Sequence, residues 1–298
     1  MSSTTIESRR YWRMFALPGV VWLVLFVVVP AYAVLAIAMG RVNFLFQPIP
    51  AWNPVTWNPG FLSQAFSGSL PGGEYWPAVR NTLVYVAVSM ALCFAIGYPV
   101  AYFVARHAKR TKTLLIVLLV IPFWVSYLLR MLAWIGLLSP DGYVNQILQT
   151  FGIANPPDWL NGNAYSVILA LVYGYIPYFI LPVFAGLDRI DRSQIEAARD
   201  LGATPFRAFL HVTLPLSRPS ILAGSALVAL PMFGDYYTND LISASPHTNM
   251  LGNEINLFVQ GGSEKNLGAS LVIVLMVLLT IGMGYYLYST ARDARRMA

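Results

Sequence analysis

Three ionisable residues lie within or beside strongly apolar stretches of the chain, where a charge is costly and usually functional. They are Arg130, Asp235 and Asp240. The neighbouring apolar stretches also carry aromatic residues, namely Trp124, Tyr127, Tyr173, Tyr175 and Tyr178. Aromatic faces combined with a carboxylate would suit an organic ammonium, through ion pairing and cation–π contact. These residues are therefore candidates for contact with a solute.

A purely structural explanation is also available for each candidate. Arg130 could extend its guanidinium to the membrane surface, or pair with an aspartate simply to keep two charges out of lipid. For Asp235 both explanations stay open, and Asp240 lies where it could already be in water. Packing between helices is the commoner use of buried aromatic residues.

Motifs for covalent chemistry and metal binding are absent from the sequence. It contains no GxxxxGK[ST] phosphate loop, no GxSxG and no HExxH pattern. His107, His211 and His247 lie on separate segments without the spacing of metal ligands. The single cysteine, Cys93, excludes an intrachain disulfide and a cysteine cluster. We therefore expect no catalytic residue, no metal site and no cofactor.

The composition places the chain in a lipid bilayer. Hydrophobic residues make up 57% of the 298 residues, charged residues only 11%, and the mean hydropathy is +0.60. A membrane-spanning helix needs roughly 20 apolar residues. Six segments meet this requirement: 15–39, 81–105, 113–137, 164–187, 219–240 and 267–290. The sequence thus predicts an all-α, polytopic protein with six transmembrane helices.

Two of these segments need comment. The first follows Arg9, Arg10 and Arg13, as in a signal peptide, but its apolar run is too long, so we expect a retained helix. The fifth is interrupted by Pro231 and Gly234.

The distribution of lysine and arginine predicts the orientation, because positive residues are retained on the cytoplasmic side. Fifteen of the 19 lie before the first span, between spans two and three, between spans four and five, or after the sixth. We expect both termini to be cytoplasmic, with a tail of residues 1–14 and a single transmembrane domain of residues 15–298. This topology explains the net charge of +6, so we do not expect nucleic-acid binding.

The predicted orientation allows the depth of Arg130 and Asp235 in the membrane to be estimated. Counted along straight helices at about 1.5 Å per residue, Arg130 is expected about 25 Å, and Asp235 about 24 Å, from the cytoplasmic ends of their spans. Both would then lie towards the outer surface.

The longest cytoplasmic segment, residues 188–218, is polar but patterned. Ser193 and Glu196 have the spacing of a capping box, which predicts a short helix with Ser193 as N-cap. Gly202 is placed to end this helix in a left-handed conformation. Thr204-Pro205 then predicts the start of a second short helix, with Thr204 as N-cap.

The second helix would present an apolar face. Phe206, Phe209 and Leu210 fall on one side of it. Together with the arginines of the segment, this face suits the docking of another protein.

These residues resemble a known motif. The run Glu196-Ala197-Ala198-x3-Gly202, followed nine residues later by Val212-Thr213-Leu214-Pro215, is similar to the EAA motif of ABC importer permeases, with Val212 in place of Ile. The resemblance implies a MetI-like permease fold and a loop that couples to a separate ATPase. It implies coupling roles for Glu196, Ala197, Ala198, Gly202, Pro205, Phe206, Leu214 and Pro215. Each of these could alternatively serve only as a cap, a helix stop or a break before the next span.

Two further stretches, Pro122–Arg130 and Gly234–Leu241, resemble those of spermidine/putrescine permeases. That resemblance implies a polyamine importer built from this subunit, a second related permease, two copies of an ATPase and an extracytoplasmic solute-binding protein. An importer for another solute, such as an oxyanion, iron or thiamine, stays open. A secondary carrier would leave the EAA-like loop unexplained, and a membrane enzyme would lack a catalytic constellation.

Overall fold

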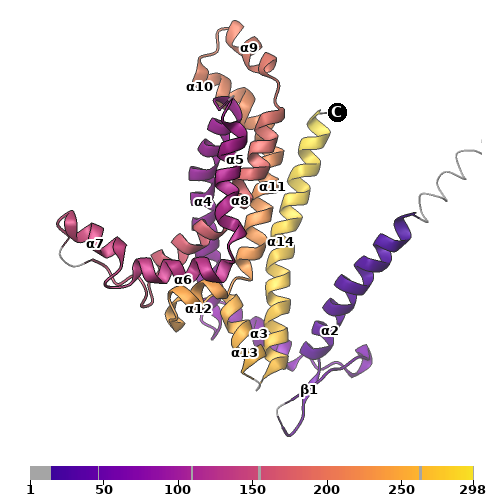
Figure 1. Ribbon diagram of the computed structural model, residues 1–298. Coiled ribbons are helices and arrows are strands. Elements are labelled where there is room, and N and C mark those ends of the chain that lie inside the picture. Colours follow the sequence, from indigo (N-terminus) through magenta and orange to yellow (C-terminus); the bar gives the residue numbers. More distant parts are fainter. Residues whose placement is uncertain (1–14, 46, 109, 154–155, 262–263, 298) are drawn as a thin grey trace, which may run out of the picture. The chain divides into compact units, whose positions relative to one another are not determined.

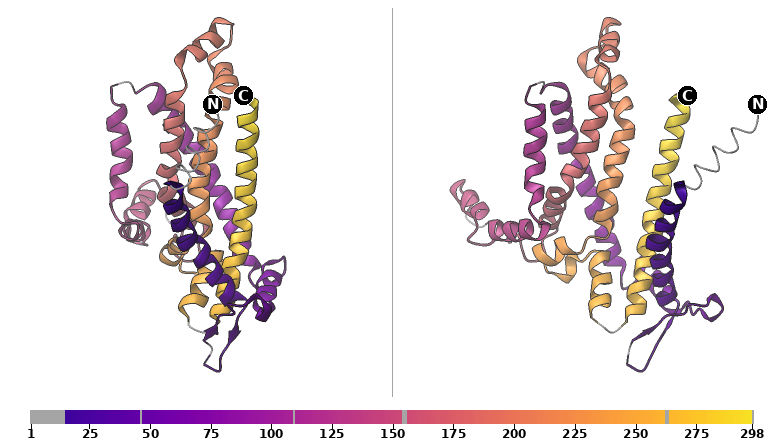
Figure 2. Two further views of the ribbon diagram at one scale, coloured as in Figure 1. Left: turned by 90° about the vertical axis from the view of Figure 1, so that its right-hand side faces the viewer. Right: turned by 45° about the vertical axis from the view of Figure 1, so that its right-hand side comes forward.

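The computed structural model shows a mainly helical chain (Figures 1 and 2). Its residues divide into two compact units. One consists of residues 1–73 and 255–276, and the other of residues 74–254 and 277–298. The described residues are 15–45, 47–108, 110–153, 156–261 and 264–297, without the side chains of 285–287 and 289–297. The predicted cytoplasmic tail, residues 1–14, lies outside them. The prediction of a single transmembrane domain stays a prediction.

The first unit contains the first span, Phe15–Ala38, and the segment that follows it. Its elements are η1 (Val24–Val28) and α2 (Val29–Ala38) within that span, β1 (Arg41–Val42), β2 (Pro48–Ile49), η2 (Pro54–Thr56) and α3 (Gly60–Ser69). The two strands pair antiparallel, with Arg41 opposite Ile49, a small hairpin that the all-α prediction omits. Asn266, near the start of α14 (Lys265–Met297), donates its amide to the Ile37 carbonyl at 2.6 Å and so ties the last span to the end of the first.

The second unit contains the membrane helices between the first and the last span, together with the end of the last span. Its elements are α4 (Trp76–Arg106), α5 (Lys112–Val120), η3 (Ile121–Trp124), α6 (Tyr127–Leu138), α7 (Tyr143–Thr150), α8 (Ala164–Arg189), α9 (Arg192–Asp200), α10 (Pro205–Ala208), η4 (Phe209–Thr213), α11 (Leu214–Phe233), α12 (Tyr237–Ile242), η5 (Pro246–Thr248), the start of α13 (Leu251–Gln260) and the end of α14. In Figure 1, α9 and α10 lie beyond one end of α8 and α11, and α6 and α12 lie near the other.

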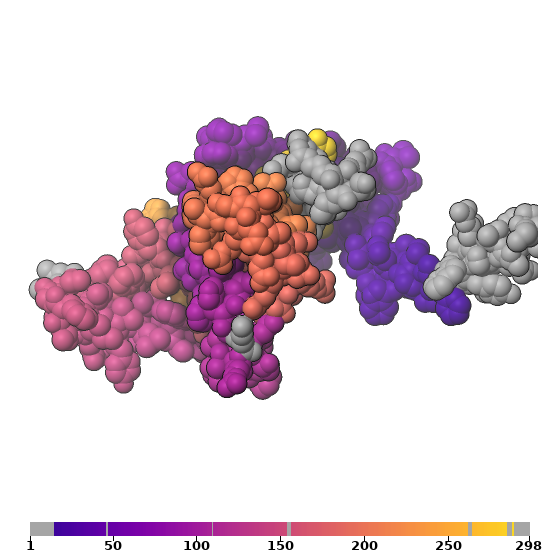
Figure 3. Space-filling view, turned by 90° about the horizontal axis from the view of Figure 1, so that it is seen from above, coloured from indigo at the N-terminus to yellow at the C-terminus, as the bar shows by residue number. Residues whose placement is uncertain are grey.

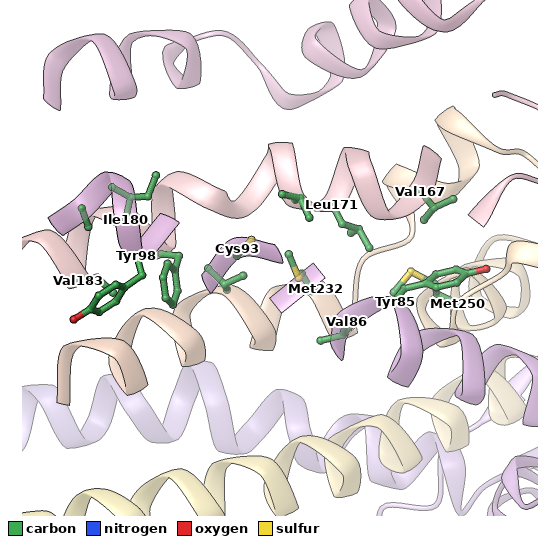
Figure 4. Packing of buried hydrophobic residues seen from close by; sticks show 14 of the residues in the cluster. Tyr85, Val86, Cys93, Tyr98, Val167, Leu171, Ile180, Val183, Met232 and Met250 are labelled. Atoms are coloured by element: carbon green, nitrogen blue, oxygen red, sulfur yellow. The ribbon is translucent and has the colours of Figure 1, made fainter. Parts of the chain in front are cut away.

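The core of this unit lies where α4, α8 and α11 pack together. Cys93, Leu171 and Met232, one from each helix, are fully buried there (Figure 4). The helices approach closely because small residues line the contact. A Cβ atom added at Gly186 of α8 would lie 2.3 Å from the Cβ atom of Ser220 on α11. The packing of α8 on α11 thus depends on a glycine at this position.

Six spans are accounted for only if a bent pair of helices is taken as one of them. Five helices of the described residues are long and apolar enough to cross a membrane. The predicted third span, 113–137, is instead two helical segments, Lys112–Trp124 and Tyr127–Thr150, joined at an angle of 89°. Pro122 has no N–H for a helical hydrogen bond, the chain tightens to a 3-10 turn there, and Val125 is extended. The straight helix from which the depth of Arg130 was counted is therefore wrong.

The predicted fifth span, 219–240, is also wrong in its limits. The helix runs from Pro205 to Phe233, so it begins inside the predicted cytoplasmic loop and stops before Asp235. The second short helix of that loop is consequently the first part of a span: α10 continues through the π-helical turn η4 into α11. Asp240 lies in a separate short helix, α12.

Replacing Gly186 with alanine tests the packing of α8 on α11. We expect Gly186→Ala to lower the free energy of unfolding by about 1–3 kcal/mol, because the new methyl group overlaps the Cβ atom of Ser220 and the backbones must move apart. Gly136→Ala in α6 is the matched control, since no atom lies within 4 Å of its added Cβ. Equilibrium unfolding in mixed micelles measures both. Equal stability of the two variants would contradict this packing.

Candidate functional site

The first candidate site forms where α11 ends. Gly234 terminates the helix with its amide bonded to the Pro231 carbonyl at 3.2 Å, and the Asp235 amide bonds to the Met232 carbonyl at 3.2 Å. Pro231 cannot itself donate to the helix, and glycine is a good helix terminator, so the sequence favours a stop at this point. Asp235 thus lies in the short connection between α11 and α12.

The Asp235 carboxylate is buried, with 8% of the residue exposed, and both of its oxygens accept hydrogen bonds. The Thr238 amide donates to Oδ1 at 2.9 Å, and the Thr238 hydroxyl donates to Oδ2 at 2.8 Å. The Tyr175 hydroxyl of α8 donates to Oδ2 at 2.9 Å. Because the Thr238 proton is used on Asp235, the Tyr127 hydroxyl donates to Thr238. A buried carboxylate needs such donors, and here they join α6, α8 and α12 around it.

Asp235 lines a cavity of about 510 Å³. The other lining residues are Tyr127, Arg130, Gly174, Tyr175, Tyr178, Leu227, Pro231, Gly234, Tyr236 and Tyr237. We call this the Asp235 pocket. It brings together five residues that the sequence singled out, Asp235, Arg130, Tyr127, Tyr175 and Tyr178. An anionic oxygen, a cation and several aromatic rings thus face one space.

Arg130 is buried and has no carboxylate partner among the residues that the structure describes. The residue is 9% exposed, and its guanidinium carbon lies 4.3 Å from the centre of the Phe123 ring, 5.4 Å from Tyr127 and 5.8 Å from Tyr173. Its Nε and Nη1 atoms are buried and have no hydrogen-bond partner among the described residues. Neither the predicted ion pair with an aspartate nor a guanidinium extended to the surface is observed. Cation–π contacts hold this charge instead.

Three of the predicted residues do not line the pocket. Trp124 is 82% exposed at the end of η3. Tyr173 packs edge-on against Trp134, with ring centres 5.3 Å apart. Asp240 is exposed and accepts a hydrogen bond from the Asn253 amide at 2.7 Å.

Several lining residues were missed by the sequence analysis. Tyr236 and Tyr237 stack with ring centres 4.3 Å apart, and their position directly after Asp235 was a usable signal. Gly174 matters for a different reason: a Cβ atom there would lie 2.8 Å from Cε2 of Tyr127, so only glycine leaves room for that ring. Leu227 and Pro231 add apolar surface.

The second candidate site is the segment of residues 188–218. The N-cap of its first helix, α9, lies two residues earlier than predicted, at Asp191 instead of Ser193: the Asp191 carboxylate accepts from the Ser193 amide at 3.1 Å. The predicted capping bond of Glu196 is absent, and its exposed carboxylate has no partner among the described residues. Glu196 is therefore available to another molecule.

The turn between α9 and α10, residues 201–204, has the predicted geometry; we call it, together with these two helices, the elbow. Gly202 has φ +86°, in the left-handed region that favours glycine, and its amide bonds to the Arg199 carbonyl at 2.9 Å. Thr204 caps the next helix by accepting from the Arg207 amide at 3.3 Å, with Pro205 in the first position.

The elbow presents an apolar surface. Leu201 is 90% exposed and Phe206 70% exposed, with Leu210 also exposed beside them. Figure 3 looks down on this end of the unit, where α9 and α10 lie uppermost. Phe209 does not share the surface as predicted, because it turns inward against Tyr98 and Tyr102.

The other residues of the motif frame this surface. Ala197 and Pro205 are exposed, and Ala198 is half-buried. Leu214 and Pro215 are half-buried at the start of α11. The motif thus runs from the exposed helix α9 into the membrane-spanning helix α11.

Comparisons with known proteins identify relatives of this chain. Residues 78–292 match the family described as "Binding-protein-dependent transport system inner membrane component". The chain is 32% identical over 264 residues to the spermidine/putrescine transport system permease protein PotB of Haemophilus influenzae, covering 87% of each chain. It is 31% identical over 212 residues to PotB of Escherichia coli, covering 71% of this chain and 77% of that protein.

A solved structure has the same fold. It is a bacterial ABC transporter involved in the import of the acidic polysaccharide alginate, with a TM-score of 0.70, 17% sequence identity and 98% of each chain covered. The predicted MetI-like permease fold is confirmed. The chain belongs to the binding-protein-dependent transport system inner membrane components: it is the multi-pass permease subunit of a bacterial ABC importer, a transport subunit of the inner membrane and not an enzyme.

Proposed function

We propose that this permease carries polyamines of the spermidine/putrescine class, and that the Asp235 pocket is part of their path. The observation that carries the proposal is a buried carboxylate surrounded by tyrosines in one cavity. Both relatives described above are spermidine/putrescine permeases by name.

The chemistry of the pocket fits an alkyl ammonium. Asp235 offers an anionic oxygen to an N–H donor, and the rings of Tyr178, Tyr236 and Tyr237 offer the negative faces that attract a cation. Leu227 and Pro231 offer apolar contact to a methylene chain. Alternating charge and methylene groups are what distinguish a polyamine from a simple cation.

One observation favours a second candidate, a permease for an oxyanion. Arg130 lines the same pocket, and two of its buried nitrogen atoms have no hydrogen-bond partner in the described part of the chain, so an anionic solute could accept from them. If the solute is a polyamine, Arg130 would not bind it directly. The guanidinium charge of Arg130 is already stabilised by the rings of Phe123, Tyr127 and Tyr173. The effect of Arg130 on the transported solute distinguishes the two.

We further propose that the segment 188–218 couples the permease to a separate ATPase. Leu201, Phe206 and the unpartnered Glu196 project from the elbow, and an exposed apolar surface with a free charge is typical of a protein interface. Two ATPase copies, a second related permease and an extracytoplasmic binding protein would complete the importer. The arginines of residues 188–218 support a cytoplasmic location for this segment and for both termini. The cytoplasm is also the side of the membrane on which an ATPase would find ATP.

Uptake of radiolabelled putrescine and spermidine tests the proposal that this permease carries polyamines. In a strain that lacks the gene, we expect Asp235→Asn to reduce complementation at least about tenfold, because a charge-assisted hydrogen bond contributes about 1.5–3 kcal/mol. Asp240→Asn is the matched control and should stay within about twofold, since that residue is outside the pocket and retains an acceptor for Asn253. Membrane levels of each variant are measured in parallel. Normal polyamine uptake by Asp235→Asn would contradict the proposal, and loss of sulfate or phosphate uptake in Arg130→Gln would favour the second candidate.

Copurification of the ATPase tests the coupling segment. We expect Glu196→Ala to weaken ATPase binding about tenfold through the loss of a charged contact. Gly202→Ala should weaken it too, because φ +86° costs a residue with a Cβ atom about 1–2 kcal/mol and the elbow shifts. Ser193→Ala is the control on the same helix, as its exposed hydroxyl has no partner among the described residues. Wild-type ATPase binding and uptake in both variants would overturn this assignment without affecting the solute proposal.

A further inference from the structure

A second polar cavity, unrelated to the Asp235 pocket, lies at the ends of three membrane helices. Its volume is about 510 Å³, and it is lined by Ala105, Arg106, Ala108, Lys112, Asp188, Arg189, Ile190, Asp191 and Arg192. We call it the Arg106 pocket. Four of these side chains are cationic and two are carboxylates. The cavity therefore has an excess of positive charge.

Arg106 is the unusual member of this set. Its Nη1 atom donates to the Ile190 carbonyl at 3.0 Å, which fixes the guanidinium against the end of α8. Its Nε and Nη2 atoms are buried and have no hydrogen-bond partner among the described residues. Buried guanidinium N–H groups without acceptors are unfavourable, so an acceptor is expected here.

The two carboxylates of the cavity do not supply that acceptor. Asp188 pairs with Lys112, with Nζ 2.5 Å from Oδ1. Asp191 accepts the Ser193 amide as the N-cap of α9. Arg192 donates only a long bond of 3.5 Å to the Arg106 carbonyl. Arg106, Arg189 and Arg192 are thus without an ion-pair partner among the described residues.

The position of the pocket indicates the kind of anion. Arg106 is the last residue of α4, Lys112 the first of α5 and Arg189 the last of α8. α4 and α8 are long and apolar enough to cross a membrane, and α5 belongs to the bent pair of helices. We therefore place these three helix ends at the level of the lipid headgroups. Basic pockets between transmembrane helices at this depth bind anionic headgroups.

We propose that the Arg106 pocket binds a phosphate group, with an anionic phospholipid as its source in the membrane. Phosphate oxygens accept several hydrogen bonds at once and match the planar donor set of arginine. The pocket adjoins Asp191, the N-cap of α9, so an occupant would also contact the connection between α8 and the coupling segment.

Native mass spectrometry of the importer complex purified around this full-length chain tests the proposal. The complex is delipidated in neutral detergent and titrated with dioleoyl-phosphatidylglycerol or dioleoyl-phosphatidylcholine. We expect phosphatidylglycerol to bind about tenfold more tightly, because both headgroups carry a phosphate but only phosphatidylcholine adds a quaternary ammonium, which the excess positive charge of the pocket repels. Addition of inorganic phosphate distinguishes the sources: competition identifies free phosphate as a sufficient ligand, and persistence of the lipid adduct identifies the lipid headgroup. Both results support a phosphate site.

Three variants make the test specific. Arg106→Gln should abolish the preference for phosphatidylglycerol, and Arg192→Gln should do so without disturbing the bond from Arg106 to Ile190. Arg207→Gln is the control, an exposed arginine of the same segment that does not line the pocket. Equal binding of the two lipids by the wild type would overturn the proposal. So would an unchanged preference in Arg192→Gln, or occupation of the pocket by an acidic segment of a partner protein.

Discussion

The Asp235 carboxylate is buried at a point where a membrane helix stops, and residues of three other helices, α6, α8 and α12, form the hydrogen-bond network that satisfies it. Three hydrogen bonds reach its two oxygens, from Tyr175 on α8 and from the amide and hydroxyl of Thr238 on α12. Tyr127 extends the network to α6 through the Thr238 hydroxyl. Since an unsatisfied carboxylate in an apolar interior is very costly, these contacts fix how α6 and α12 cross the end of the bundle. The carboxylate also lines the Asp235 pocket, where it lies beside the aromatic rings of Tyr127, Tyr175 and Tyr178.

The two candidate sites are joined by the same helices. The helix that ends beside Asp235 begins at Pro205 in the elbow of the coupling segment. The helix that carries Tyr175 ends at Arg189, two residues before the N-cap of α9. Gly186 and Ser220 hold these two helices in close contact between the sites. A force applied to the elbow by a partner would therefore act on both walls of the pocket, as alternating access requires.

Strong local signals made much of this architecture predictable, and tertiary contacts decided the rest. Long apolar runs located the five membrane-spanning helices of the described residues and the bent pair at Lys112–Trp124 and Tyr127–Thr150. The positive φ of Gly202 and the cap at Thr204 also followed from sequence alone. The bend at Val125 did not, because the apolar run continues through Pro122. The straight helix assumed for Arg130 was wrong for the same reason. Pro231 and Gly234 signalled the stop at Phe233, but the predicted fifth span was continued past them to Asp240. The N-cap was assigned to Ser193 because the capping-box spacing is satisfied there, although Asp191 forms the bond.

Site-directed labelling of the Asp235 pocket tests the central claim most directly. The only native cysteine, Cys93, is buried, so a thiol introduced as Tyr236→Cys would report on the pocket, and Trp124→Cys, exposed and outside it, would be the reference. The complex in proteoliposomes is treated with a cationic thiol reagent with and without spermidine. The account predicts that spermidine slows labelling at position 236 about tenfold and leaves position 124 unchanged. Equal labelling of Tyr236→Cys with and without spermidine would contradict it.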